Sequence, residues 1–194
     1  MKEKNLYNTL EIPGSFLVPG FSIYVLEISG VFDKLISDEY SDTINKKQKW
    51  FYIGMTGDPY YPSARAAFHR ISGHLELSSR STQNQLQIAL KESKIVKDDK
   101  DLEKLNIKMH HFPIKGFNRI TDKLLSTDTM IQLKRTPAYK NYQKQRQKIL
   151  VLENALIFEL KDKLLNKTEG VALRTNQIPY PEIYKNIIEL VNNE

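Results

Sequence analysis

Two tyrosines and an Arg/His pair are the first residues in this sequence whose types and spacing could do chemistry. Tyr24 and Tyr52 each lie in a predicted strand, and pairing of the two strands could bring both hydroxyls to one surface. Arg65 and His69 are four residues apart in a predicted short helix, so they share one face about one turn apart. A guanidinium beside an imidazole stabilises a helix poorly but suits a bound phosphate. The structural alternative is that the tyrosines only pack in the sheet, and that Arg and His lie exposed on a basic helix.

One carboxylate, Glu153, lies in an apolar stretch of a predicted long helix. Its neighbours about one turn away are all apolar: Ile149, Leu150, Leu156 and Ile157. A carboxylate in such surroundings costs free energy unless it is paired or bound to a metal. Mg²⁺ suits a single carboxylate because the ion keeps several of its waters. The structural alternative is that Glu153 lies at the edge of the apolar stripe and reaches solvent.

Other catalytic and metal-binding motifs are absent from the sequence. There is no cysteine, which excludes disulfides, thiolate zinc sites, iron–sulfur clusters and cysteine nucleophiles. His110 and His111 are adjacent in a predicted strand, so they point to opposite faces and cannot share a metal. No glycine-rich phosphate loop, HExxH pair or GxSxG elbow occurs.

The positive charge of the chain is concentrated in one stretch. Lys and Arg number 29 against 23 Asp and Glu, a formal net charge of +6. Residues 129–152 contain no acidic residue and hold six cations: Lys134, Arg135, Lys140, Lys144, Arg146 and Lys148. Without these six, 23 cations face 23 anions, so the whole excess is local. Such a stretch attracts a polyanion such as DNA. The alternative is an ordinary solvated helix face.

The elements that must position these residues are a small sheet and several helices. Strands are predicted at 21–28, 50–55 and 107–114, and helices at 63–71, from about 81, at 137–165 and from 181. Gly73 is expected to end the helix at 63–71, and Pro137 and Pro181 are expected to begin the last two helices. The order predicts an α+β fold: a mixed or antiparallel sheet of about three strands flanked by helices, with a helical C-terminal region.

Length and composition predict a single globular domain. The chain has 194 residues, of which 40% are hydrophobic and 27% charged, close to the average for globular proteins. No apolar run approaches the 18 residues typical of a membrane-spanning helix, and the N-terminal residues lack the apolar core of a signal peptide. A cytoplasmic protein without a membrane partner is expected.

Taken together and in this order, these residues resemble the GIY-YIG nuclease domain. Ser22-Ile23-Tyr24 and Tyr52-Ile53-Gly54 carry the two motifs after which the family is named, and Arg65 with His69, Glu153 and Asn176 follow in the family's order. The resemblance covers about 21–177, and a C-terminal helix is expected at 180–192.

Three features depart from the family pattern, and the identity of the family's asparagine is open between two residues. The first motif begins with Ser22 where the family usually has glycine. The segments at about 30–49 and 117–148 are longer than the domain needs, so both are interpreted as insertions. Asn166 competes with Asn176 for the role of the family's asparagine.

The resemblance implies metal-dependent DNA cleavage, with a role for each residue of the motif. Tyr24 would be the general base and Tyr52 would orient or replace it, with their pKa values lowered by nearby cations. Arg65 would brace the phosphate, and His69 would hydrogen-bond Tyr24 or the phosphate. Glu153 would hold one Mg²⁺ or Mn²⁺ ion.

The same resemblance assigns Asn176 a supporting hydrogen bond and implies double-stranded or branched DNA as the partner, with a homodimer as one arrangement. The alternative function is a DNA-binding module that keeps the fold but does not cut. RNA as the substrate also stays open.

Overall fold

The computed structural model of this chain describes residues 10–30, 49–57, 65–75, 85–96, 98–116 and 127–193. The first expected insertion, at 30–49, lies outside the described residues except at its two ends, and the second is described from residue 127 onward. Within these ranges, no helix has the length and apolar character needed to cross a membrane.

The sheet has three antiparallel strands, β1 (Ser22–Gly30), β2 (Trp50–Met55) and β3 (Leu105–Pro113), in the order β2-β1-β3. The predicted α+β class with about three strands is therefore confirmed. β1 is the central strand because its alternate side chains are buried on both faces, with Ile23 and Val25 on one face and Tyr24 and Leu26 on the other.

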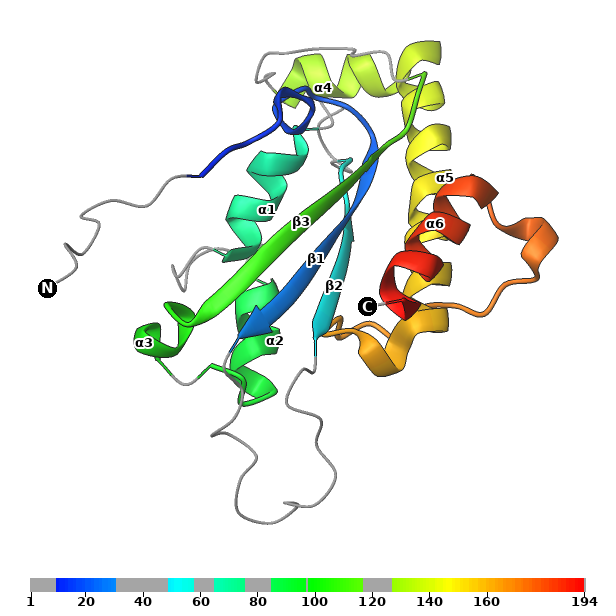
Figure 1. The fold of residues 1–194 in the computed structure, drawn as a ribbon. Helices are drawn as coiled ribbons and strands as arrows, with labels where there is room; N and C mark the ends of the chain where they lie inside the picture. Colours follow the sequence, from blue (N-terminus) through cyan, green and yellow to red (C-terminus); the bar gives the residue numbers. More distant parts are fainter. Residues whose placement is uncertain are drawn as a thin grey trace, which may run out of the picture.

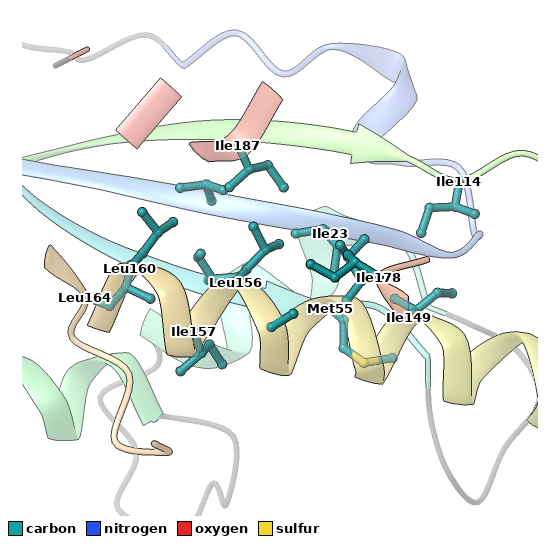
Figure 2. Packing of buried hydrophobic residues seen from close by; sticks show 14 of the residues in the cluster. Ile23, Met55, Ile114, Ile149, Leu156, Ile157, Leu160, Leu164, Ile178 and Ile187 are labelled. Atoms are coloured by element: carbon teal, nitrogen blue, oxygen red, sulfur yellow. The ribbon is translucent and has the colours of Figure 1, made fainter. Parts of the chain in front are cut away.

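Helices cover both faces of this sheet (Figure 1). α1 (Ala67–Leu75) and α2 (Gln85–Glu92) pack against the Tyr24 face, whereas α5 (Pro137–Leu160) and α6 (Pro181–Asn192) pack against the Ile23 face. α3 (Asp99–Leu102) precedes β3, and α4 (Thr127–Lys134) precedes α5. Figure 2 shows Ile149, Leu156 and Leu160 of α5 against the strands, where burying one such side chain contributes about 1.5–3 kcal/mol.

The long helix α5 begins as predicted but ends earlier. Thr136 caps its N-terminus by accepting a hydrogen bond from the backbone N–H of Tyr139, and Pro137 occupies the first helical turn. The helix ends at Leu160 instead of near residue 165. The reason is that the following backbone pairs with the outer edge of β2: the N–H of Leu165 donates to the carbonyl of Phe51 at 2.7 Å.

Helix α1 differs most from its prediction. Residue 63 lies outside the described residues, α1 begins at Ala67, and it continues through Gly73 to Leu75. A glycine inside a helix costs about 0.5–1 kcal/mol. Burial of Ala67, Ile71 and His74 at helical spacing outweighs that cost, because all three lie on the face that packs against the sheet.

Candidate active site

The two tyrosines of the motifs lie on the same face of the sheet, on neighbouring strands. Tyr24 is directly opposite Gly54 in the β1–β2 register. A Cβ atom built on Gly54 would overlap the Tyr24 phenol, so the absence of a side chain there lets the phenol lie across β2. The glycine of the second motif is therefore required by the position of the tyrosine of the first.

His74, in the last turn of α1, contacts both tyrosines. Its Nε2 atom lies 2.6 Å from the Tyr24 hydroxyl oxygen, a short hydrogen bond between two buried side chains. The ring centroids of Tyr52 and His74 are 5.1 Å apart. The imidazole thus joins the two phenols into one buried group.

Arg70 brings a positive charge to the same group. It precedes His74 by four residues, so both side chains project from the same face of α1. Its guanidinium interacts with Tyr24 through a side-chain hydrogen bond and through its charge, and the same charge acts on Tyr52 and Glu153. The Nε atom of Arg70 is buried and has no hydrogen-bond partner among the described residues.

Arg65 and His69, the expected Arg/His pair, lie together at the start of α1. They do contact each other, with Nη1 and Nε2 3.1 Å apart, but the contact is exposed. Arg65 lies before the first residue of α1, and His69 is rotated about 140° from His74 around the helix axis. The structure therefore brings a second Arg/His pair of the same spacing to the tyrosines, because α1 continues past Gly73.

Glu153 acts on the tyrosines through its charge, from the helix on the other face of the sheet. It projects from α5, and its carboxyl accepts a hydrogen bond from the backbone N–H of Met55 at the end of β2. Burial raises the pKa of this carboxyl to about 7, although Arg70 and Arg146 act in the opposite direction. Its negative charge also raises the pKa of both Tyr24 and Tyr52. The sequence predicts that ionisation of Glu153 costs free energy because its neighbours are apolar, and the raised pKa agrees with that prediction.

The protein groups around the two tyrosines do not produce the expected lowering of their pKa values. Burial raises the pKa of Tyr24 well above its ordinary value, and the neighbouring Tyr52 adds to the effect. Burial likewise raises the pKa of Tyr52. Arg70 opposes both shifts without reversing them. Both phenols therefore keep their protons near neutral pH.

Asn166, and not Asn176, lies beside the second motif. Its side-chain oxygen accepts from the N–H of Ile53 at 2.9 Å, and its side-chain nitrogen donates to the carbonyl of Ile53 at 2.7 Å. The amide thus occupies the hydrogen-bonding edge of β2 as a neighbouring strand would. Asn176 is exposed in a short turn, Thr175–Gln177, which Figure 1 shows in orange on the side of the molecule away from α1.

Ser22 has a structural use of its own in the first motif. Its N–H donates to the Thr56 hydroxyl at 2.7 Å, and the two hydroxyl oxygens lie 3.2 Å apart. Both side chains are buried. Only the contact between the two hydroxyls depends on serine, and it adds to the link between the start of β1 and the end of β2.

The basic stretch separates into two groups. Lys140, Lys144 and Lys148 are exposed and follow each other at intervals of four, so they form one stripe along α5. Lys144 is rotated about 180° from Glu153, so this stripe faces away from the site. Lys134 and Arg135 are exposed near the end of α4. Arg146 is only partly exposed and acts on Glu153 through its charge.

The donors around Glu153 fit a hard divalent cation. The carboxyl and the nearby phenols are oxygen groups, the type that Mg²⁺ and Mn²⁺ prefer. Among the described residues there is no group of three His, Asp or Glu that could enclose a metal. A magnesium site does not need one, since one carboxylate can be completed by water and by phosphate oxygens.

Comparison with protein-family models, with curated proteins and with solved structures finds no match to this chain. The resemblance to GIY-YIG nucleases therefore rests on the residues of the motifs and on the contacts described above.

Proposed function

We propose that this chain is a metal-dependent DNA endonuclease of the GIY-YIG type. The observation that carries the proposal is the meeting of Tyr24, His74, Arg70 and Glu153 near the end of β2, from the central strand and from helices on both faces of the sheet. A hydrolase acting on a phosphodiester needs a proton acceptor for the attacking water, positive charge for the phosphate and help for the leaving oxygen. This group of residues can supply each of them.

Tyr24 and His74 would handle the proton of the attacking water. Because the Tyr24 phenol is protonated near neutral pH, it does not start as a phenolate. With the imidazole hydrogen on Nδ1, the phenol donates to Nε2 across the 2.6 Å contact. When water attacks phosphorus, its proton passes to the Tyr24 oxygen and the phenolic proton passes to His74. The imidazole is then the final acceptor of the proton.

Arg70 and Glu153 would hold the phosphate and the metal. The Arg70 guanidinium, whose charge already acts on Tyr24 and Glu153, would supply positive charge to the phosphate. The Glu153 carboxylate would hold Mg²⁺ or Mn²⁺, which when bound supplies positive charge to the phosphate and the leaving oxygen. The exposed cations at the end of α4, Lys134 and Arg135, would attract the surrounding DNA by releasing counterions.

Plasmid nicking tests this function. Supercoiled plasmid is incubated with the purified protein in Mg²⁺, with and without EDTA, beside the variants Glu153→Ala and Glu159→Ala. Glu159 is exposed on the same helix and serves as the matched control. Nicking that requires Mg²⁺ and is lost only in Glu153→Ala is expected. Salt-dependent plasmid binding without nicking by the wild type would favour the non-cutting DNA-binding module instead.

A further inference from the structure

Arg146 differs from the other cations of its helix. It is partly buried, whereas Lys140, Lys144 and Lys148 are exposed. Its Nε atom donates a hydrogen bond to the carbonyl oxygen of Gly57, two residues beyond the end of β2, at 3.1 Å. A long flexible side chain is thereby held in one place next to the strand that carries the second motif.

The position of Arg146 is tied to that of Glu153. The two residues are seven apart on α5, which puts them on the same face, about 20° apart around the axis. Glu153 accepts from the N–H of Met55, and Arg146 donates to the carbonyl of Gly57, so the two side chains bind the backbone at both ends of one three-residue segment. This arrangement fixes the guanidinium within the electrostatic reach of the Glu153 carboxyl.

Most of the donors of Arg146 remain available for a ligand. A guanidinium has five N–H groups in a rigid fork, and the Gly57 contact uses one of them. Within the part of the chain that the structure describes, no other hydrogen bond from this side chain is found, and none of its nitrogens is sealed from solvent without a partner. Such a fork matches the geometry of two phosphate oxygens.

The charge of the site calls for more than one phosphate. Glu153 contributes one negative charge when ionised, and Arg70 and Arg146 contribute two positive charges. Adding one divalent ion leaves an excess of three positive charges, and a single phosphodiester carries only one negative charge. A stretch of nucleic-acid backbone with neighbouring phosphates balances such a site better than an isolated phosphate ester.

We propose that Arg146 is a second phosphate-binding residue of the site, which holds a backbone phosphate next to the one that is cleaved. The inference rests on the proposed nuclease function. Arg146 sets where the strand lies relative to the metal-holding carboxylate, and the Gly57 hydrogen bond keeps its guanidinium aimed. The exposed lysines on the far face of α5 do not share this role, because they point away from Glu153.

Two variants separate the charge of Arg146 from its structural contact. Arg146→Gln removes the charge but keeps a side-chain N–H that can donate to Gly57, and Arg146→Ala removes both. Lys144→Gln removes one charge from the opposite face of the same helix and is the control. Steady-state nicking is measured over a range of plasmid concentrations, and binding of a DNA duplex is measured over a salt series with Ca²⁺ in place of Mg²⁺.

Arg146→Gln is expected to raise KM and to weaken duplex binding by about 10-fold or more, the loss typical of a charge-assisted contact, while kcat changes much less. The slope of the logarithm of the binding constant against the logarithm of the salt concentration should become shallower, by the amount expected for the loss of about one phosphate contact. Lys144→Gln should change KM and binding by less than about 3-fold, as expected for an exposed charge.

Equal effects of Arg146→Gln and Lys144→Gln would overturn the inference. So would a loss confined to Arg146→Ala, because it would assign Arg146 only the Gly57 contact. If the chain is not a nuclease, the wild type does not nick plasmid at all, which is a different result from either of these. The binding series still decides the role of Arg146 in that case, since unchanged affinity in Arg146→Gln excludes a phosphate contact.

Discussion

Replacing Glu153 by glutamine is expected to make the metal-free protein more stable, by an amount that grows with pH. Glu153 is only partly exposed, and this partial burial raises the pKa of its carboxyl to about 7 although two arginines act in the opposite direction. Glutamine keeps the size of the side chain and an oxygen that can accept from the Met55 N–H, but it carries no charge. A group retained for chemistry at a cost in stability is typical of functional sites.

The size of the effect follows from linkage between protonation and folding. The carboxyl has a pKa of about 7 in the folded chain against an ordinary value of 4.5. Between these values the folded chain binds a proton that the unfolded chain has released, so the free energy of unfolding falls as the pH rises. Each pKa unit corresponds to about 1.4 kcal/mol. Ionisation of Glu153 therefore lowers the free energy of unfolding by about 3 kcal/mol well above pH 7, and by about 1 kcal/mol at about pH 5.5.

Urea unfolding of the wild type and Glu153→Gln at about pH 5.5 and about pH 8.5 in EDTA measures this difference. The variant should gain about 2 kcal/mol more at the higher pH than at the lower. Glu159→Gln, at an exposed position of the same helix, is the control. Added Mg²⁺ should stabilise the wild type but not Glu153→Gln. A stability difference that is independent of pH would refute the assignment of Glu153 as a buried carboxyl of raised pKa.

Two further substitutions test the contacts along β2. Gly54→Ala should lower the free energy of unfolding by about 1–3 kcal/mol and abolish nicking, because its Cβ displaces the Tyr24 phenol; retention of full nicking activity would contradict this contact. Asn166→Ala should cost about 1–3 kcal/mol in urea unfolding, because it leaves the N–H and C=O of Ile53 unpaired, whereas Asn176→Ala should change stability by less than about 0.5 kcal/mol. Equal costs for the two asparagines would remove the structural role of Asn166.

The fold could be predicted where local patterns and packing agree. β2 begins and ends at the predicted residues, and Pro137 and Pro181 begin α5 and α6 as expected. The end of α5 could not be read from the sequence, because Leu164 and Leu165 continue an apolar pattern whose backbone instead pairs with β2. That pairing is a tertiary contact between residues more than one hundred positions apart.

The site could be predicted only in part for a similar reason. The positions of Tyr24, Tyr52 and Glu153 in strands and a helix follow from clear patterns in the sequence. Two Arg/His pairs with identical spacing occur within ten residues, and only the face of α1 distinguishes them. A signal was present: His74 follows Ala67 and Ile71 at the spacing of one buried helical face, which requires the helix to pass Gly73.

The raised pKa values of the tyrosines had no signal in the sequence. They arise from burial between the sheet and α1 and from the proximity of the two phenols, and both depend on the folded arrangement. The same holds for the separation of Arg146 from the lysines of its helix, since charge counts along the chain do not reveal which side of α5 faces the sheet.

The most direct test of this site is a comparison of His74→Ala with His69→Ala in the initial rate of plasmid nicking in Mg²⁺. We predict that His74→Ala loses about 100-fold or more, because it removes the acceptor of the Tyr24 proton, and that His69→Ala stays close to the wild type. Circular dichroism and thermal unfolding establish that both variants are folded. A rate lost in His69→Ala and retained in His74→Ala would contradict the account.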